Sequence, residues 1–149
     1  MTAITWPHGH LPHAFCVFLR DATPAQDRWY TRIPRNRTYP LGTVQLAGLG
    51  PLGTDSHISS DQVRLQIDHW AEREDQAAAL AAETFRLLDF RFPSGLRDVV
   101  WLTPDEGEAG RIYETRIERC ERSGGGDTYL DEFARVWRAT AFYNVKVNL

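Results

Sequence analysis

The chain has 149 residues, of which 42% are hydrophobic and 25% charged, the size and composition of one folded domain of about 100–200 residues. Its 17 basic and 20 acidic residues give a formal net charge of -3, so it lacks the basic excess that nucleic-acid-binding proteins use to neutralise phosphates. We therefore expect a single domain over residues 1–149 and exclude a dedicated nucleic-acid binder.

The two cysteines, Cys16 and Cys120, lie far apart and have no metal-ligand spacing, which indicates free thiols. The N-terminus carries Pro7 and several histidines where a signal peptide would have a basic start and an apolar run. Every apolar run is far shorter than the roughly 18–20 residues that span a bilayer. The sequence predicts a protein made in the cytoplasm, without a membrane segment.

The first elements are short. Residues 11–19 form an apolar block that Pro12 could open as a first-turn proline, which predicts a helix. Residues 28–33 alternate polar with aromatic or aliphatic side chains and stop at Pro34, which predicts a strand.

A second strand, over residues 43–47, leads into a polar, glycine-rich loop that reaches Asp61. Residues 48–53 superficially resemble a phosphate-binding loop, but they lack its Gly-Lys-Ser/Thr ending and no helical pattern follows. We expect a turn there.

The clearest pattern lies between residues 63 and 90. Residues 63–70 alternate with a period of two, which predicts a strand with one buried face. Residues 75–88 then repeat apolar side chains at helical spacing, with Asp75 as a possible N-cap. Ala77, Leu80 and Ala81 give this helix a narrow face, which we expect to pack closely on a sheet.

The second half reads as strands. Residues 98–102 predict a short strand, and residues 112–122 predict a strand in which neither face is continuously apolar. We expect residues 123–132, with three consecutive glycines, to be a flexible acidic connection to the longest strand, residues 136–147.

The order of elements is therefore α-β-β-β-α-β-β-β. It indicates an α+β fold: a two-layer sandwich in which two α-helices pack on a mixed or antiparallel β-sheet.

Few residues are candidates for metal binding or catalysis. His8, His10 and His13 could meet a divalent metal, although their terminal position favours a mobile segment. The acidic residues 105–108 could hold calcium, but they lack EF-hand spacing, and a solvated turn is the better interpretation.

The least implausible acid-base group is His69 with Asp68 and Glu72. A lone histidine on the inner face of a strand is more often simply hydrogen-bonded core. No cysteine or serine stands in a nucleophile motif, and Cys16 reads as a small buried hydrophobe. We expect no enzyme, no cofactor and no metal.

Aromatic residues are unusually common on strands that lack a second apolar face. Two helices can cover one face of a sheet, so the surplus implies either a second cover of loops or burial against another subunit. The residues concerned are Trp70, Trp101, Tyr113 and Trp137.

The strand-helix unit of residues 63–81 resembles the motif of tail terminator and tail completion proteins of long-tailed bacteriophages. That motif is a strand of the type V-x-V-D-V-W-A, a short polar turn and a helix carrying A-x-x-L-A; here the strand reads V-R-L-Q-I-D-H-W-A. Ile33-Pro34, a strand ending at Gly48 and a final strand over residues 135–147 follow the family's order. Gene-transfer particles and contractile tails use similar proteins.

This resemblance implies a structural virion protein of the tail-neck region, assembled in the host cytoplasm. It would form a ring, typically a hexamer, that caps the completed tail tube, ends tube polymerisation and offers the head-side connector a joining surface. DNA would pass through the ring without specific binding. A head-tail connector or head-completion protein is an alternative, and a small α+β enzyme using His69 is another.

We expect the interface with other subunits or the tail tube to use the polar face of the strand over residues 63–70 and the glycine-acid segment. That segment would be an arm that becomes ordered on binding, or else an ordinary solvated loop. The interface residues are Arg64, Gln66, Asp68, Trp70, Gly124, Gly125, Gly126, Asp127, Asp131 and Glu132.

Overall fold

The computed structural model describes residues 3–5, 10–49 and 60–148. It confirms the α+β fold and the order α-β-β-β-α-β-β-β, which a short additional strand, β1, precedes. The elements are β1 (Ala3–Thr5), α1 (Leu11–Ala22), β2 (Trp29–Tyr30), β3 (Leu41–Leu49), β4 (Ser60–Ala71), α2 (Glu74–Leu88), β5 (Arg97–Pro104), β6 (Ile112–Asp131) and β7 (Val136–Asn148).

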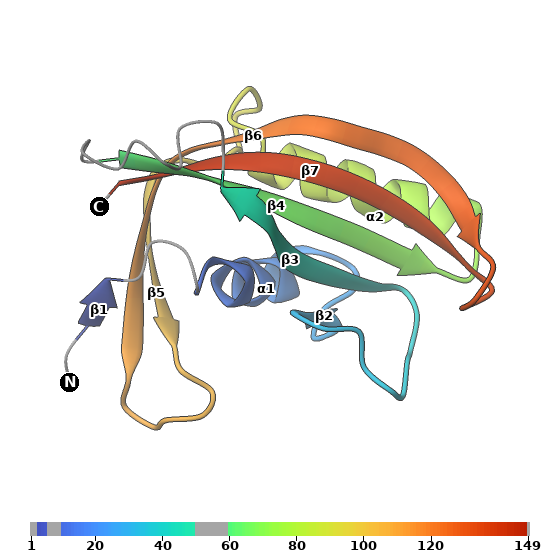
Figure 1. Cartoon of the computed structure of the whole chain (residues 1–149), viewed down its shortest axis with the longest axis horizontal. Helices are drawn as coiled ribbons and strands as arrows, with labels where there is room; N and C mark the ends of the chain where they lie inside the picture. Colours follow the sequence, from blue (N-terminus) through green and yellow to red (C-terminus); the bar gives the residue numbers. More distant parts are fainter. Residues whose placement is uncertain (1–2, 6–9, 50–59, 149) are drawn as a thin grey trace.

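The strands form one mixed sheet in the order β1-β6-β7-β4-β3-β2, with β5 paired to β6 outside this path. The pairs β1–β6 and β2–β3 are parallel and the others are antiparallel. The sheet curls, with α1 inside the curl beside β3 and α2 running along β4, β6 and β7 (Figure 1). Both helices therefore cover the same, concave face.

One hydrophobic core fills this concave face. Strand β4 contributes Val63, Leu65 and Ile67, all fully buried, as its alternation predicts. Helix α1 adds Phe15, and α2 adds Leu80. Because side chains of both helices belong to the same buried cluster as these β4 residues, the core joins the two helices and the sheet into one unit.

The alanine-rich face of α2 packs on the sheet as predicted. Ala77 lies in a buried cluster with Ala71 of β4 and Ala139 of β7, and Ala81 packs against that cluster. Three small side chains leave little between the helix and the strands, so the backbones approach closely.

The expectation of a flexible connection over residues 123–132 is wrong. Strand β6 continues through the glycines to Asp131 and pairs with β7 along this whole length. Three register shifts interrupt the pairing, and Gly125 and Gly126 adopt φ angles of 84° and 116°. These bulges erase the period-two pattern by which a strand is recognised in sequence, although the ladder continues around them.

The predicted N-cap of α2 is also wrong. The helix begins at Glu74, the capping position is Arg73, and no side chain caps it. Asp75 instead lies in the first turn, where its carboxylate accepts a hydrogen bond from the Arg73 guanidinium at 2.6 Å. An acid there still stabilises the helix through the positive end of its dipole. Pro12 lies in the first turn of α1, as predicted.

Several boundaries extend past the predicted ones. Gly48 and Leu49 belong to β3, and the rest of the predicted loop, residues 50–59, lies outside the described residues. In the described part of the chain, neither helix is long and apolar enough to cross a membrane.

A substitution of Leu80 by Asp tests the core assignment of α2. Leu80 is buried against the sheet, so an aspartate would have a buried carboxylate without a partner and would cost several kcal/mol of unfolding free energy. Ala79→Asp is the matched control because Ala79 is exposed one residue earlier, and it should change the free energy by less than about 0.5 kcal/mol. Urea denaturation measures both. Equal stability of the two variants would contradict the assignment.

Candidate interaction surfaces

The convex face of the sheet has a buried ion pair at its centre. Asp68 of β4 is only 1% exposed. Its two carboxylate oxygens accept hydrogen bonds from Nε and Nη2 of Arg138 on β7, each at 3.0 Å. Thr140 and Gln66 also donate to this carboxylate, at 2.5 and 3.0 Å. A bidentate pair with further donors fixes the register of β4 against β7.

One end of this convex face is covered by the chain itself. Trp70 is 8% exposed and packs in a second small core with Leu41 and Val136, against which Tyr30 and Tyr39 also pack. The segment between β2 and β3 therefore supplies a cover of loops. Of the two explanations for the surplus strand aromatics, a cover of loops or burial against another subunit, the first is correct for Trp70.

Two of the other strand aromatics also have partners within the subunit. Trp101 of β5 stacks on Phe18 of α1, with ring centroids 4.8 Å apart, and meets Phe15 edge to face. Tyr113 of β6 stacks on His10 at 3.8 Å. Packing between α1 and the β5–β6 pair thus uses much of the aromatic surplus.

The predicted interface residues fall into two groups. On β4, Arg64 is exposed and Gln66 half-buried, whereas Asp68 and Trp70 are buried in the subunit. The Arg64 guanidinium lies over the Phe142 ring, 4.4 Å from its centroid.

The glycine-acid group lies on β6 and its turn. A Cβ built on Gly124 would stand 4.0 Å from a terminal nitrogen of Arg64, so the structure brings these two predicted residues together. Gly125, Gly126 and Asp127 are exposed along the bulged part of β6. Asp131 and Glu132 lie at its far end, and a contact of these residues with a partner remains a prediction.

The acid-base group suggested around His69 is not assembled. The His69 ring is fully buried on the concave face, with Nδ1 2.9 Å from the carbonyl oxygen of Ala139 and Nε2 3.0 Å from the Thr84 hydroxyl. Burial lowers the pKa of His69 to about 4. The Asp68 carboxylate lies on the opposite face of β4, as the pleat requires, and Glu72 is exposed. His69 has the environment of a hydrogen-bonded core residue.

The candidate metal ligands are occupied by other contacts. His10 and His13 lie edge to face with centroids 5.0 Å apart, and His8 lies outside the described residues. Among the residues that the structure describes, no three His, Cys, Asp or Glu side chains converge as metal ligands. In the predicted calcium turn, Asp105 accepts hydrogen bonds from Gly107 and Tyr113.

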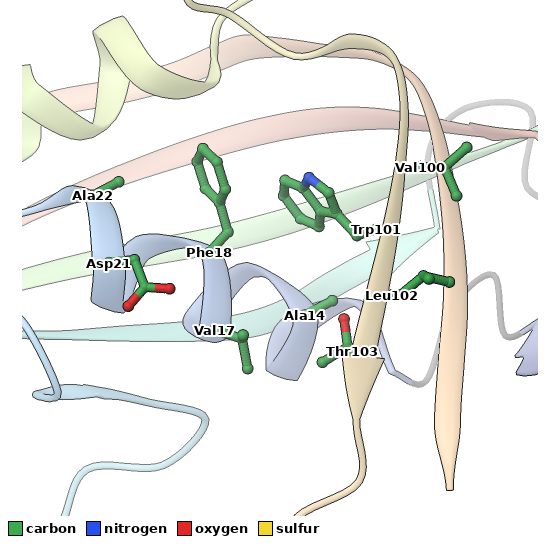
Figure 2. Close-up of a pocket in the computed structure, with 9 residues that line it drawn as sticks. All are labelled: Ala14, Val17, Phe18, Asp21, Ala22, Val100, Trp101, Leu102 and Thr103. Carbon is green, nitrogen blue, oxygen red and sulfur yellow. The ribbon is translucent and has the colours of Figure 1, made fainter. Parts of the chain in front are cut away.

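A groove between α1 and β5 is a surface that the sequence did not reveal (Figure 2). It has a volume of about 310 Å³, and Val100 and Leu102 on its rim are 49% and 62% exposed. Strand β5 pairs with β6 on one edge, and no other described strand pairs with it. The run Val99-Val-Trp-Leu102 indicated this exposed surface. Because successive side chains of a strand point to opposite faces, Val100 and Leu102 must point away from the core when Trp101 points toward it.

A second exposed apolar surface lies at the β6–β7 turn. Phe133 is fully exposed, and Tyr129 and Leu130 before it are 44% and 49% exposed. The groove and this turn lie at opposite ends of the molecule (Figure 1). Exposed apolar side chains at both places make them candidate interaction sites.

The chain matches no protein-family model, and it has no significant match among curated proteins. Its fold is similar to that of a chain in a solved structure described as the virion of a native gene transfer agent particle. The TM-score is 0.59 at 14% sequence identity, and the match covers 91% of this chain and 94% of the other. At this identity, the match shows a shared fold.

A substitution of Arg138 by Met tests the ion pair on the convex face. The variant would leave the Asp68 carboxylate buried without its cation, and we expect a loss of about 2–3 kcal/mol in unfolding free energy. The double variant Arg138→Met, Asp68→Asn removes the unpaired charge and should recover most of that loss. Chemical denaturation measures both. If the double variant is no more stable than the single one, the pair does not hold the strands together.

The buried His69 makes stability depend on pH. Its pKa is about 4 in the folded chain against 6.5 as the ordinary value, so the unfolded chain takes up the proton first as the pH falls. The stabilisation is complete above pH 6.5 and is lost between about pH 6.5 and 4, by about 3 kcal/mol in all. Denaturation midpoints should fall less steeply in this window for His69→Gln. An unchanged slope would show that His69 does not titrate on unfolding.

His10→Gln is the comparison variant for this measurement. Burial, with a smaller effect of His13, lowers the pKa of His10 to about 4, so His10 contributes with the same sign. Its ring is only half-buried, and we expect a smaller change of slope.

Proposed function

We propose that this chain is a structural virion protein of the tail-terminator type, which forms a ring on the completed tail tube. The observation that carries the proposal is the shared fold with a chain of a gene transfer agent virion, over 91% of this chain and 94% of the other. The resemblance of residues 63–81 to the tail-terminator motif supports it independently, because that resemblance is one of sequence.

The motif forms the centre of the fold. Its strand is β4, the central element of the sheet, and its helix is α2. The apolar positions of the motif, such as Leu65 and Leu80, are buried in the core, and Ala77 sets the close approach of the helix. The motif thus specifies the scaffold, while contacts with partners must come from the surface.

The surface supports assembly. Apolar side chains are exposed at the two ends of the molecule, in the α1–β5 groove and at the β6–β7 turn. On the convex face, by contrast, Arg138 is neutralised by Asp68, and Lys146 pairs with Glu118 at 3.4 Å. A surface of paired charges suits a ring through which DNA slides without specific binding.

In the proposed role, six copies close into a ring in the tail-neck region. One side of the ring contacts the tail tube protein and stops its polymerisation, and the other side receives the head-side connector. The work is mechanical and uses complementary surfaces between subunits.

Light scattering and electron microscopy test this role. Alone at micromolar concentrations, the protein should give particles of about six times the 17.0 kDa of one chain in light scattering. If assembly needs the tube, six copies should assemble after addition of tail tubes from the same virion. In negative stain these should be rings at one end of each tube, and tubes polymerised in the presence of the protein should have a uniform length.

Two outcomes count against the proposal. Monomers at every concentration, with tubes left bare, would exclude the terminator role. Binding to DNA-filled heads that lack tails, with no binding to tubes, would instead identify a head-completion protein. Separate binding experiments with tail tubes and with DNA-filled heads distinguish these roles.

A further inference from the structure

The α1–β5 groove combines an apolar floor with an exposed acid, Asp21. Val17 and Phe18 of α1 and Trp101 of β5 line it, whereas Val100 and Leu102 point to the other side of β5 (Figure 2). The Asp21 carboxylate lies at the end of the groove near Ala22 (Figure 2). Asp21 is exposed, and within the described part of the chain its carboxylate has no hydrogen-bond or ion-pair partner. The groove therefore suits an apolar group that carries a positive charge beside it.

The β6–β7 turn presents such a group in a fixed geometry. Oδ1 of Asp131 accepts hydrogen bonds from the backbone N–H groups of Phe133 and Ala134, at 3.1 and 3.0 Å. The Asp131 carbonyl accepts a third from the N–H of Arg135 at 2.7 Å. These bonds order the turn while the Phe133 ring stands fully exposed. Binding through Phe133 would cost little conformational entropy.

Arg135 supplies the positive charge. Its side chain is exposed two residues after Phe133, and it has no side-chain partner among the residues that the structure describes. The turn also carries Glu132, whereas Arg116, opposite Val100 in the β5–β6 register, is already paired with Glu114 at 2.8 Å. The turn thus offers one cation, Arg135, that can be matched with Asp21 of the groove.

A subunit cannot join these two surfaces by itself. Strand β6 separates them: β5 pairs with its first part, and the turn follows its last residue. In Figure 1, the β5–β6 pair and the β6–β7 turn lie at opposite ends of the molecule. Two different surfaces at opposite ends make a head-to-tail contact, which closes into a ring when the rotation between copies allows it.

We propose that the β6–β7 turn of one copy inserts Phe133 into the α1–β5 groove of the next copy, with Arg135 against Asp21. The occupant of the groove is a second copy of this chain. A volume of about 310 Å³ is at the small end of the range for binding pockets, which suits one aromatic side chain. An aromatic anchor in a desolvated pocket, with a charge pair at its edge, is the usual composition of a binding hot spot. The proposal deepens the proposed function by naming the surfaces that join the ring.

Cysteine cross-linking tests the contact even where association is weak. Both native thiols, Cys16 and Cys120, are buried, and burial raises the pKa of each, so they should not react. A chain with Phe133→Cys and Val17→Cys should give on oxidation a ladder of covalent oligomers that ends at the ring size. The control chain carries Phe133→Cys and Leu46→Cys, because Leu46 is exposed on β3 outside the groove. A ladder no stronger than that of the control overturns the proposal.

Charge reversal tests the partner residues. Asp21→Arg and Arg135→Asp should each weaken self-association about 10-fold, measured by sedimentation velocity over a concentration series, and the double variant should restore it. Phe133→Ser should weaken it by about 30-fold or more, and Leu46→Ser should leave it unchanged. If the double variant is no better than the two single variants, Arg135 does not meet Asp21.

Mixing establishes the head-to-tail order. Phe133→Ser keeps an intact groove, and Val17→Glu keeps an intact turn but places a charge in the groove. An equimolar mixture should form one contact per pair and stop at dimers. A mixture that still forms rings overturns the proposal.

These outcomes separate the contact from the proposed function. Rings on tail tubes that are unaffected by Phe133→Ser would leave the terminator role standing with another interface. A covalent ladder from a protein that ignores tail tubes would leave the contact standing without the terminator role.

Discussion

The rest of the structure depends on one constraint: β6 must pair with β5 along its first part and with β7 along its second. The strands β5 and β7 take opposite edges of β6, since Ile117 pairs with both of them. The three register shifts against β7 are bulges that bend and twist the sheet. Asp89, just after α2, ties the helix to this bend. Its carboxylate accepts hydrogen bonds from the Arg91 side chain and from the backbone N–H of Arg122. Burial alone would raise the pKa of Asp89, but these hydrogen bonds outweigh the effect of burial and hold the pKa at about 2.

The bend produces a concave face with one apolar core and a convex face with a different chemistry. Both helices and β4 share the concave core, and His69 is buried there as a neutral, hydrogen-bonded residue. On the convex face, the Asp68–Arg138 pair is held against Trp70, since the guanidinium lies 4.5 Å from the Trp70 ring centroid. An ion pair flanked by an aromatic ring is shielded from water, which strengthens it and fixes the alignment of β4 with β7.

The same bend places the exposed apolar surfaces far apart. β5 pairs with β6 as far as Arg119, and at about 3.3 Å per residue the strand from there to Asp131 spans roughly 40 Å, so β5 and the β6–β7 turn do not meet within one subunit. Apolar groups that have no partner in their own subunit favour association with another. In the proposed ring, the fold would thus direct this association along one axis, from the turn of one copy to the groove of the next.

The sequence by itself determined what depends on neighbours along the chain. Alternation through Ile67 and helical spacing through Leu80 placed β4 and α2 and identified their buried faces, because one-sided burial repeats at every second or every third to fourth residue. The tertiary structure decided the rest. Gly124 to Asp127 are strand because β7 lies beside them, Trp70 is buried because the segment before β3 folds over it, and Asp75 pairs with Arg73 instead of capping α2. The groove likewise exists only because α1 and β5 lie side by side and touch along only part of their length, although they are about ninety residues apart in the sequence. Pairing and cover by distant residues leave no periodic trace in the segment that they bury, and so no local pattern could report them.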